Sequence, residues 1–222
     1  MGLKIRWLGH SSFQIKTGEK VLYLDLYRSK KLRERVPDKL EPATIVLVSH
    51  EHNDHCFPEA IDEVRSDDTV VIAPEDCREK LRYSFESLKP GEESTFGDIR
   101  IRAVHAYNVK RFRSPGNPFH PKGYGVGYLI NAEGKTIYFA GDTDVIPEMN
   151  ELGPIDVALL PCGDTYTMDN LDAAEATKVI KPRVVIPMHT WDKSTDEFKA
   201  GVSDTGTKFV ALKEGEEYTV VD

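Results

Sequence analysis

The sequence predicts an α/β fold in which two mixed β-sheets stack face to face with helices on the outside, a four-layered αββα sandwich. Three observations lead to this prediction. Apolar β-strand patterns occur along the whole chain, strands alternate with helical segments in both halves, and no fixed-period repeat indicates a solenoid or a propeller. Because each half has a β-rich segment followed by βαβ units, we expect each half to form one sheet.

The first half begins with three strands, and the turn residues Thr17, Gly18 and Glu19 join the second and third as a hairpin. The run at residues 44–48 is apolar on both faces, as a central strand would be. Pro58 fits the first turn of a helix. The predicted strands cover residues 4–8, 12–16, 21–26, 44–48 and 70–73, and the predicted helices cover residues 58–65 and 74–83.

The second half contains a glycine- and proline-rich loop between its first two strands, and a turn at Glu133 and Gly134 between its second and third strands. Strands and helices then alternate. The predicted strands cover residues 99–104, 125–130, 136–140, 156–160, 183–187, 209–212 and 217–221, and the predicted helices cover residues 171–180 and 194–200.

The composition is that of an ordinary globular protein, with 222 residues, 40% hydrophobic and 30% charged. No linker divides the chain, so we expect a single domain over residues 1–222. The net charge of −8 disfavours broad nucleic-acid binding. Without a long apolar run or a signal peptide, no membrane partner is expected and a cytoplasmic location is predicted. The oligomeric state stays open, with an oligomer allowed.

The three cysteines, Cys56, Cys77 and Cys162, lack CxxC spacing, so we expect reduced thiols rather than disulfides or a cysteine zinc site. Histidines and a carboxylate instead gather directly after the strand at residues 44–48. Within six residues the chain carries His50, His52, Asp54 and His55. Imidazole nitrogens and carboxylate oxygens are ligands for zinc and similar divalent ions. The sequence therefore predicts a metal site in this loop.

The segment from His50 to His55 resembles the HxHxDH signature of the metallo-β-lactamase superfamily, and His105, Asp142 and His189 resemble the later ligands in the family's order. The resemblance covers essentially the whole chain. It implies a first metal on His50, His52 and His105, a second on Asp54, His55 and His189, and Asp142 as a ligand of both.

This resemblance implies a hydrolase with two divalent metal ions, zinc before manganese or iron. A hydroxide between the two ions would attack the substrate, and Asp54 would act as the catalytic residue that moves a proton towards the leaving group. Alternative interpretations remain for single residues. His105 is also compatible with a core histidine, with His120 as the substitute ligand, and Asp142 with a helix N-cap.

The segment from Leu8 to Phe13 reads LGHSSF and resembles the branch that contains the L-ascorbate-6-phosphate lactonases. By this resemblance His10 lies near the site, as a substrate contact or a residue behind the ligands, with a structural histidine as the alternative. Asp25 resembles an acidic position that steadies the HxHxDH loop, with an ordinary turn carboxylate as the alternative.

Four basic residues, Lys110, Arg111, Arg113 and Lys122, lie in the loop at residues 108–123. On a chain with net negative charge this loop favours a small anionic substrate, such as an ester, lactone or phosphoester. A solvated loop is the alternative. Tyr166 is a candidate wall of the substrate site, whereas Asp169 also fits a helix cap. Arg111, Arg113, Lys122, His120 and Tyr166 complete the predicted substrate contacts.

Three rival functions use the same scaffold. A flavodiiron-type oxidoreductase would have an acidic ligand in place of a histidine of the motif, so His52 argues against it. An RNA-processing nuclease would have to bind a polyanion despite the acidic surface. A non-catalytic metal-binding protein is disfavoured by the complete set of ligand types.

Overall fold

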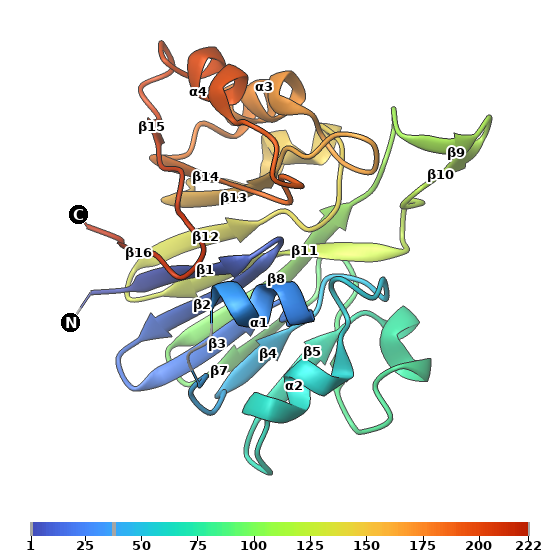
Figure 1. The fold of residues 1–222 in the computed structure, drawn as a ribbon, viewed down its shortest axis with the longest axis vertical. Helices are drawn as coiled ribbons and strands as arrows, with labels where there is room; N and C mark the ends of the chain where they lie inside the picture. Colours follow the sequence, from blue (N-terminus) through green and yellow to red (C-terminus); the bar gives the residue numbers. More distant parts are fainter. Residues whose placement is uncertain (1, 37–38, 222) are drawn as a thin grey trace. The chain divides into compact units, whose positions relative to one another are not determined.

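The computed structural model describes residues 2–36 and 39–221, and within it the chain divides into two compact units. Unit 1 comprises Met1–Leu88 and Leu212–Asp222, and unit 2 comprises Lys89–Ala211. Each unit contains one seven-stranded sheet (Figure 1). Two mixed sheets were expected from the sequence, while a single domain over the whole chain stays a prediction.

The sheet of unit 1 has the strand order β16-β1-β2-β3-β4-β5-β6. Its strands are β1 (Lys4–Gly9), β2 (Ser12–Thr17), β3 (Lys20–Leu24), β4 (Ile45–Leu47), β5 (Val70–Ala73), β6 (Glu86–Ser87) and β16 (Glu217–Thr219). The pairs from β16 to β3 are antiparallel and those from β3 to β6 are parallel. Gly18 has φ +58° in the β2–β3 turn, which explains the glycine there.

Helix α2 (Pro58–Val64) packs on one face of this sheet. Pro58 occupies the first turn, and Ala60, Ile61 and Val64 are buried against strand residues such as Val46. The described residues of the unit also form α1 (Lys30–Arg35) and the 3₁₀ helix η1 (Glu75–Glu79). The prediction of a longer helix at residues 74–83 is wrong. Beyond Pro74 at its start, only Cys77 and Leu81 are buried in this segment, which gives too few apolar contacts to hold three turns of α-helix.

The sheet of unit 2 has the order β15-β14-β13-β12-β11-β8-β7. Its strands are β7 (Glu93–Phe96), β8 (Ile99–Ala106), β11 (Gly125–Ala132), β12 (Lys135–Phe139), β13 (Val157–Pro161), β14 (Val184–Met188) and β15 (Lys208–Phe209). Strands β12 to β15 are parallel, and β7, β8 and β11 continue the sheet in antiparallel pairs. The long loop carries a small hairpin of β9 (Phe112–Ser114) and β10 (Asn117–Pro118), which projects from the sheet of its unit in Figure 1.

Helices α3 (Asn170–Ile180) and α4 (Asp196–Gly201) pack against each other in unit 2, which also contains the 3₁₀ helix η2 (Pro147–Glu151). Asp169 caps α3, because its side chain accepts a hydrogen bond from the backbone N–H of Asp172. A Cβ at Gly201 would lie 2.7 Å from that of Ala174, so the glycine permits the close approach of α4 to α3.

No helix in the described ranges has the length and apolar character needed to cross a membrane. The cytoplasmic location predicted from the sequence stays a prediction. For function, the important feature of each sheet is the edge where its parallel strands end, because loops leaving that edge carry the histidines and aspartates.

Candidate metal-binding site

In unit 1 the predicted metal-binding loop leaves the sheet at the end of β4. Strands β3 and β4 are parallel, with Leu24 paired to Leu47, so their carboxyl ends meet at one edge. Asp25 follows β3, and Ser49 stands two residues beyond β4. The backbone N–H of Asp25 donates to the carbonyl of Leu47 at 2.9 Å. The topology therefore places Asp25 beside the start of the histidine loop.

Asp25 is fully buried and holds the loop with both carboxylate oxygens. Its Oδ1 accepts from the backbone N–H of Ser49 at 2.6 Å, and its Oδ2 lies 2.6 Å from Ser49 Oγ and 2.6 Å from His55 Nδ1. Burial raises the pKa of Asp25, while His55 and Ser49 act in the opposite direction. The predicted role of Asp25 in steadying the loop agrees with these three contacts.

The contacts of Asp25 and Ser49 also determine which ring nitrogens of His50 and His55 carry the proton. Ser49 Oγ donates to Asp25, so it accepts from Nδ1–H of His50 at 2.9 Å. His55 donates its own Nδ1–H to Asp25. Nε2 is then the basic nitrogen of both rings, as in a histidine that binds a metal through Nε2. His50 Nε2 lies 3.1 Å from His52 Nδ1.

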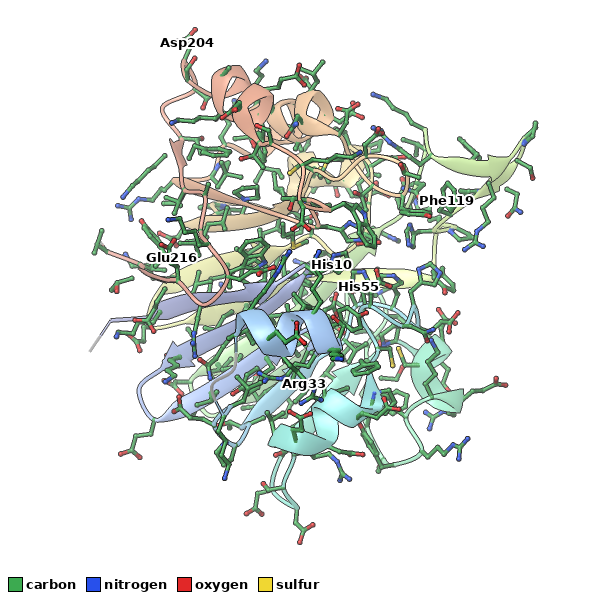
Figure 2. All side chains as sticks on the ribbon, in the orientation of Figure 1. His10, Arg33, His55, Phe119, Asp204 and Glu216 are labelled. Carbon is green, nitrogen blue, oxygen red and sulfur yellow. The ribbon has the colours of Figure 1, made fainter. Side chains whose placement is uncertain are left out.

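His10 lies beside the same loop, as the sequence predicted. Its Nε2 is 2.9 Å from Oδ2 of Asp54, and its ring centroid is 5.6 Å from that of His55 (Figure 2). Trp7 Nε1 donates to the carbonyl of His10 at 2.9 Å, and His10 has φ +54°. The backbone of this residue is held in a conformation that few non-glycine residues adopt, which is common at functional positions.

In unit 2 three side chains converge at the edge where β12 and β14 end. Asp142 follows β12 and His189 follows β14, two strands that flank β13 in the parallel part of the sheet. Oδ2 of Asp142 lies 3.3 Å from Nε2 of His189 and 3.4 Å from Nε2 of His120. All three residues are buried. Asp142 is not a helix cap, because η2 begins only at Pro147 and its N-cap is Ile146.

His120 is held in place by Asn108 at the base of the long loop. Oδ1 of Asn108 accepts from both the backbone N–H and the Nδ1–H of His120, each at 2.8 Å. Nδ2 of Asn108 donates to the carbonyl of Tyr166 at 3.0 Å. This arrangement turns Nε2 of His120 towards Asp142.

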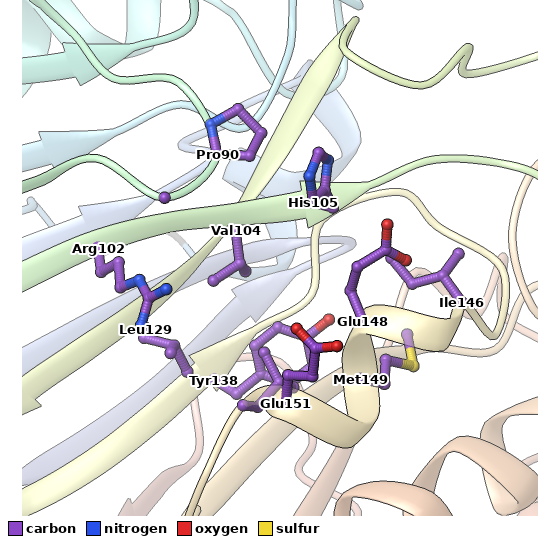
Figure 3. Close-up of a pocket in the computed structure, with 12 residues that line it drawn as sticks. Pro90, Arg102, Val104, His105, Leu129, Tyr138, Ile146, Glu148, Met149 and Glu151 are labelled. Atoms are coloured by element: carbon purple, nitrogen blue, oxygen red, sulfur yellow. The ribbon is translucent and has the colours of Figure 1, made fainter.

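His105 is not part of this convergence. It lies within β8, paired with Val126, and lines a separate pocket of about 250 Å³ together with residues of η2 such as Glu148 and Met149 (Figure 3). Its Nδ1 is buried and has no hydrogen-bond partner in the described part of the chain. The structure thus brings His120, the alternative named from the sequence, to Asp142. In the sequence, the feature that indicates His120 as a ligand is its position before Pro121, near the point where the long loop returns to the sheet.

The basic loop is largely neutralised inside unit 2. The guanidinium of Arg111 contacts four carboxylates: Asp144 at 3.1 Å, Asp169 at 3.1 Å, Asp164 at 3.7 Å, and Asp172. Oδ2 of Asp144 also accepts backbone N–H groups of residues 109, 110 and 111 at 2.8, 2.7 and 3.2 Å. Arg111 therefore organises the loop, and its contacts argue against a substrate-binding role.

The other cations of the loop are partly paired. Lys110 Nζ lies 2.7 Å from Asp172, and Lys122 Nζ lies 2.6 Å from Glu148. Arg113 stacks over Phe119, with 5.3 Å from Cζ to the ring centroid, and forms no ion pair with a described residue. Of the four cations, only Arg113 keeps a charge that no carboxylate of the described chain offsets. An anionic substrate stays a prediction, and the pairing of three of these four cations weakens the argument for it.

Aromatic side chains surround His189 on the same edge. Tyr166 is 40% exposed and Trp191 is 50% exposed, and the Trp191 ring meets that of His189 edge-on at 5.2 Å. Tyr166 was predicted from the sequence as a wall of the substrate site, whereas Trp191 was not predicted. The sequence feature that could have indicated Trp191 is its position two residues after His189, a predicted metal ligand. Asn108 and Asp144, which hold the loops, were also missed because their roles depend on contacts between distant segments.

The fold and these donor groups define a protein of the metallo-β-lactamase class. Residues 4–189 match the family described as the beta-lactamase superfamily domain. The chain belongs to this superfamily and, within it, to the family of UPF0173 metal-dependent hydrolases. It is 36% identical to the member from Thermococcus kodakarensis over 97% of this chain and 98% of the relative. It is 32% identical to the member from Pelotomaculum thermopropionicum, over 96% of this chain and 98% of that one.

Solved structures confirm the predicted fold class. A Parabacteroides distasonis protein described as a metal-dependent hydrolase superposes with a TM-score of 0.86 at 32% identity, covering 96% of this chain and 94% of that one. The metallo hydrolase Igni18 of Ignicoccus hospitalis gives a TM-score of 0.77 at 26% identity, covering 99% and 98%. The narrower resemblance to the lactonase branch stays a prediction.

Proposed function

We propose that this protein is a metal-dependent hydrolase whose divalent ions are bound by two sets of donors. The first set is His50, His52, Asp54 and His55 in unit 1, and the second is His120, Asp142 and His189 in unit 2. The observation that carries the proposal is the convergence of the second set from three distant segments. The names of the relatives support the hydrolase class and leave the number and identity of the metals to experiment.

The spacing of the donor atoms suits a shared cation. Ligand atoms about 2.0 to 2.1 Å from a tetrahedral zinc ion lie roughly 3.3 to 3.4 Å from one another. Oδ2 of Asp142 lies 3.3 and 3.4 Å from Nε2 of His189 and His120. The separation of 3.1 Å between His50 and His52 is close to this value. The residues therefore fit a zinc-like ion without rearrangement of these atoms.

Metals bound by such donors supply a water that ionises near neutral pH and Lewis acids for the substrate oxygen. Within the chain, Asp54 is the proposed proton carrier. Its carboxylate is 30% exposed, so it is accessible to a substrate, and His10 Nε2 at 2.9 Å orients Oδ2. Asp25 keeps His50 and His55 in fixed tautomers, and Asn108 does the same for His120.

The finer features are part of this proposal. They are two ions per chain, zinc in preference to manganese or iron, and a small ester, lactone or phosphoester as substrate. A redox function is the second candidate on this fold. CmlA of Streptomyces venezuelae, a diiron β-hydroxylase, superposes with a TM-score of 0.76 at 14% identity, which is a likeness of fold alone.

The test combines metal analysis with a substrate panel. The purified protein is analysed for zinc, manganese and iron by mass spectrometry, stripped with a chelator, and reloaded with each metal. Small esters, lactones, phosphodiesters and RNA are then assayed. We expect about two ions per chain, loss of hydrolysis on stripping and recovery on reloading. A fully loaded protein that hydrolyses none of the substrates would contradict the proposal, and strong visible absorption from bound iron would favour the redox candidate.

A further inference from the structure

We propose that the substrate carries a flat aromatic or conjugated group, which stacks on Trp191 and Tyr166 beside His189. This inference rests on the proposed function and adds the class of substrate. In this proposal the main surface that recognises the substrate is aromatic. The basic loop is not that surface, because its cations are mostly paired.

The first observation is the exposure of these rings. Trp191 and Tyr166 are 50% and 40% exposed, and their centroids lie 6.4 Å apart. Tyr166 meets Phe119 edge-on at 4.8 Å, and Trp191 meets His189 edge-on at 5.2 Å. The rings therefore form a continuous row that ends at a predicted metal ligand. Clustered exposed aromatic rings next to a reactive group are typical of ligand sites.

The second observation is backbone strain in the two loops that carry the rings. Asp164 and Thr165, just before Tyr166, have φ +65° and +59°. His189, Trp191 and Asp192 have φ +52°, +53° and +59°. Non-glycine residues adopt this region at a free-energy penalty, and such strain is maintained mostly where function requires it.

The third observation is that the two loops are locked together. A Cβ at Gly163 would lie 1.9 Å from the carbonyl oxygen of His189 and 2.7 Å from Cδ1 of Trp191, so only glycine permits this approach. Lys193 Nζ donates to the carbonyl of Gly163 at 2.8 Å and lies 3.8 Å from Asp164 Oδ2. The rings are therefore held in advance of binding, which reduces the entropy lost when a ligand stacks on them.

The ring row favours an uncharged flat group. Beside it, the carboxylate of Asp164 lies 3.8 Å from Lys193 and 3.7 Å from Arg111, so these charges largely offset one another. An aromatic ring fits this surface better than a saturated ring of similar size, because edge-to-face and offset-stacked contacts require a π-face. The reacting ester or lactone carbonyl would then lie towards His189.

The experiment compares two methyl esters that share a leaving group and differ in one ring: methyl phenylacetate and methyl cyclohexylacetate. We expect kcat/KM to be about 3- to 10-fold higher for the phenyl ester, as for one aromatic pair. Trp191→Leu should bring the ratio close to one, whereas Trp191→Phe should preserve it within about 2-fold. Leu171→Ala serves as the control, because Leu171 is 65% exposed on α3 and lies outside the ring row.

Binding of the acid products is measured separately, in protein with and without metal. Phenylacetate should quench tryptophan fluorescence saturably and bind at least 3-fold more tightly than cyclohexylacetate, and the quenching should disappear in Trp191→Phe. Equal affinity for the two acids, or no binding of phenylacetate, would overturn the inference. If phenylacetate binds but the metal-loaded protein hydrolyses none of the esters, lactones and phosphodiesters of the panel, the aromatic site stands and the proposed hydrolase function fails. If wild type and Trp191→Leu both hydrolyse the two esters equally well, the hydrolase function stands and the aromatic site fails.

Discussion

The two units assemble their donor residues in different ways. In unit 1 the candidates His50, His52, Asp54 and His55 follow one another in a single loop, and one buried carboxylate, Asp25, braces two of the histidines. In unit 2, by contrast, the candidates come from three loops separated along the chain, and His120 has its own brace in Asn108. In the contiguous set of unit 1, one residue, Asp25, positions two donors. In the dispersed set of unit 2, Asn108 positions only His120.

This difference has consequences for mutation. A change at the shared brace should disturb several donors of unit 1 together, because Asp25 connects to His55 directly and to His50 through Ser49. A change at a brace in unit 2 should disturb a single donor. The following variants test this contrast, from the largest expected effect to the smallest.

The largest effect is expected at His120. Its mutation tests whether His120, which lies beside Asp142 in the structure, or His105, which the family resemblance implied, is the metal ligand. His120→Ala should abolish the binding of about one metal ion per chain and nearly all hydrolysis, because it removes a donor beside Asp142. His105→Ala should keep both within about 2-fold. Metal stoichiometry and hydrolysis are measured for the two variants. Normal metal content in His120→Ala with loss in His105→Ala would restore His105 as the ligand.

The shared brace is tested by Asp25→Asn. Metal affinity should fall by about 10- to 100-fold, as for other residues that orient metal ligands. The free energy of unfolding should fall by about 3 kcal/mol, because buried donors lose their acceptor. Chelator competition and urea unfolding provide the two measurements. Asp67→Asn, an exposed acidic residue of the same unit, is the control, and an equal response of both variants would contradict the bracing role.

The single brace is tested by Asn108→Ala, which removes the acceptor for both N–H groups of His120. Metal affinity should fall by about 10-fold, at the lower end of such effects. Asn108→Asp keeps the acceptor and loses only the donation to Tyr166, so it should recover most of the affinity. A decrease in Asn108→Asp as large as that in Asn108→Ala would show that Asn108 acts through the Tyr166 loop instead.

The smallest effect on metal binding is expected at Asp172, which pairs with Lys110 and Arg111 away from the donors. Burial alone would raise its pKa, but hydrogen bonds from these cations lower it. Asp172→Asn should reduce the free energy of unfolding at pH 7 by roughly 2 kcal/mol with little change in metal affinity. A carboxylate whose pKa is lowered by folding stabilises the protein above its unfolded pKa.

The stability difference between wild type and Asp172→Asn should therefore shrink as the pH falls below the ordinary value of 3.8 and through the lowered pKa. Urea unfolding at several pH values measures it. A difference that stays constant down to the lowest pH at which the protein folds would exclude the ion pairs as its cause.

Much of the fold was predictable because strand and helix patterns are local. The predicted strand at residues 44–48 corresponds to β4, the helix at residues 171–180 to α3, and the hairpin turn at Gly18 to the β2–β3 turn. Elements with little local signal were missed, among them α1, η2 and the hairpin of β9 and β10. The final two predicted strands are present in shorter form, and β15 and β16 join different sheets, which no local pattern could indicate.

The sequence by itself determined the family, the fold class and the histidine loop after β4, because these depend on residues that are neighbours in the chain. Only the tertiary structure decided that His120 rather than His105 lies beside Asp142, that Asp25 braces two histidines, and that aspartates neutralise Arg111. The physical reason is that a donor's partner is fixed by strand order and loop closure, which bring together side chains that lie tens of residues apart in sequence.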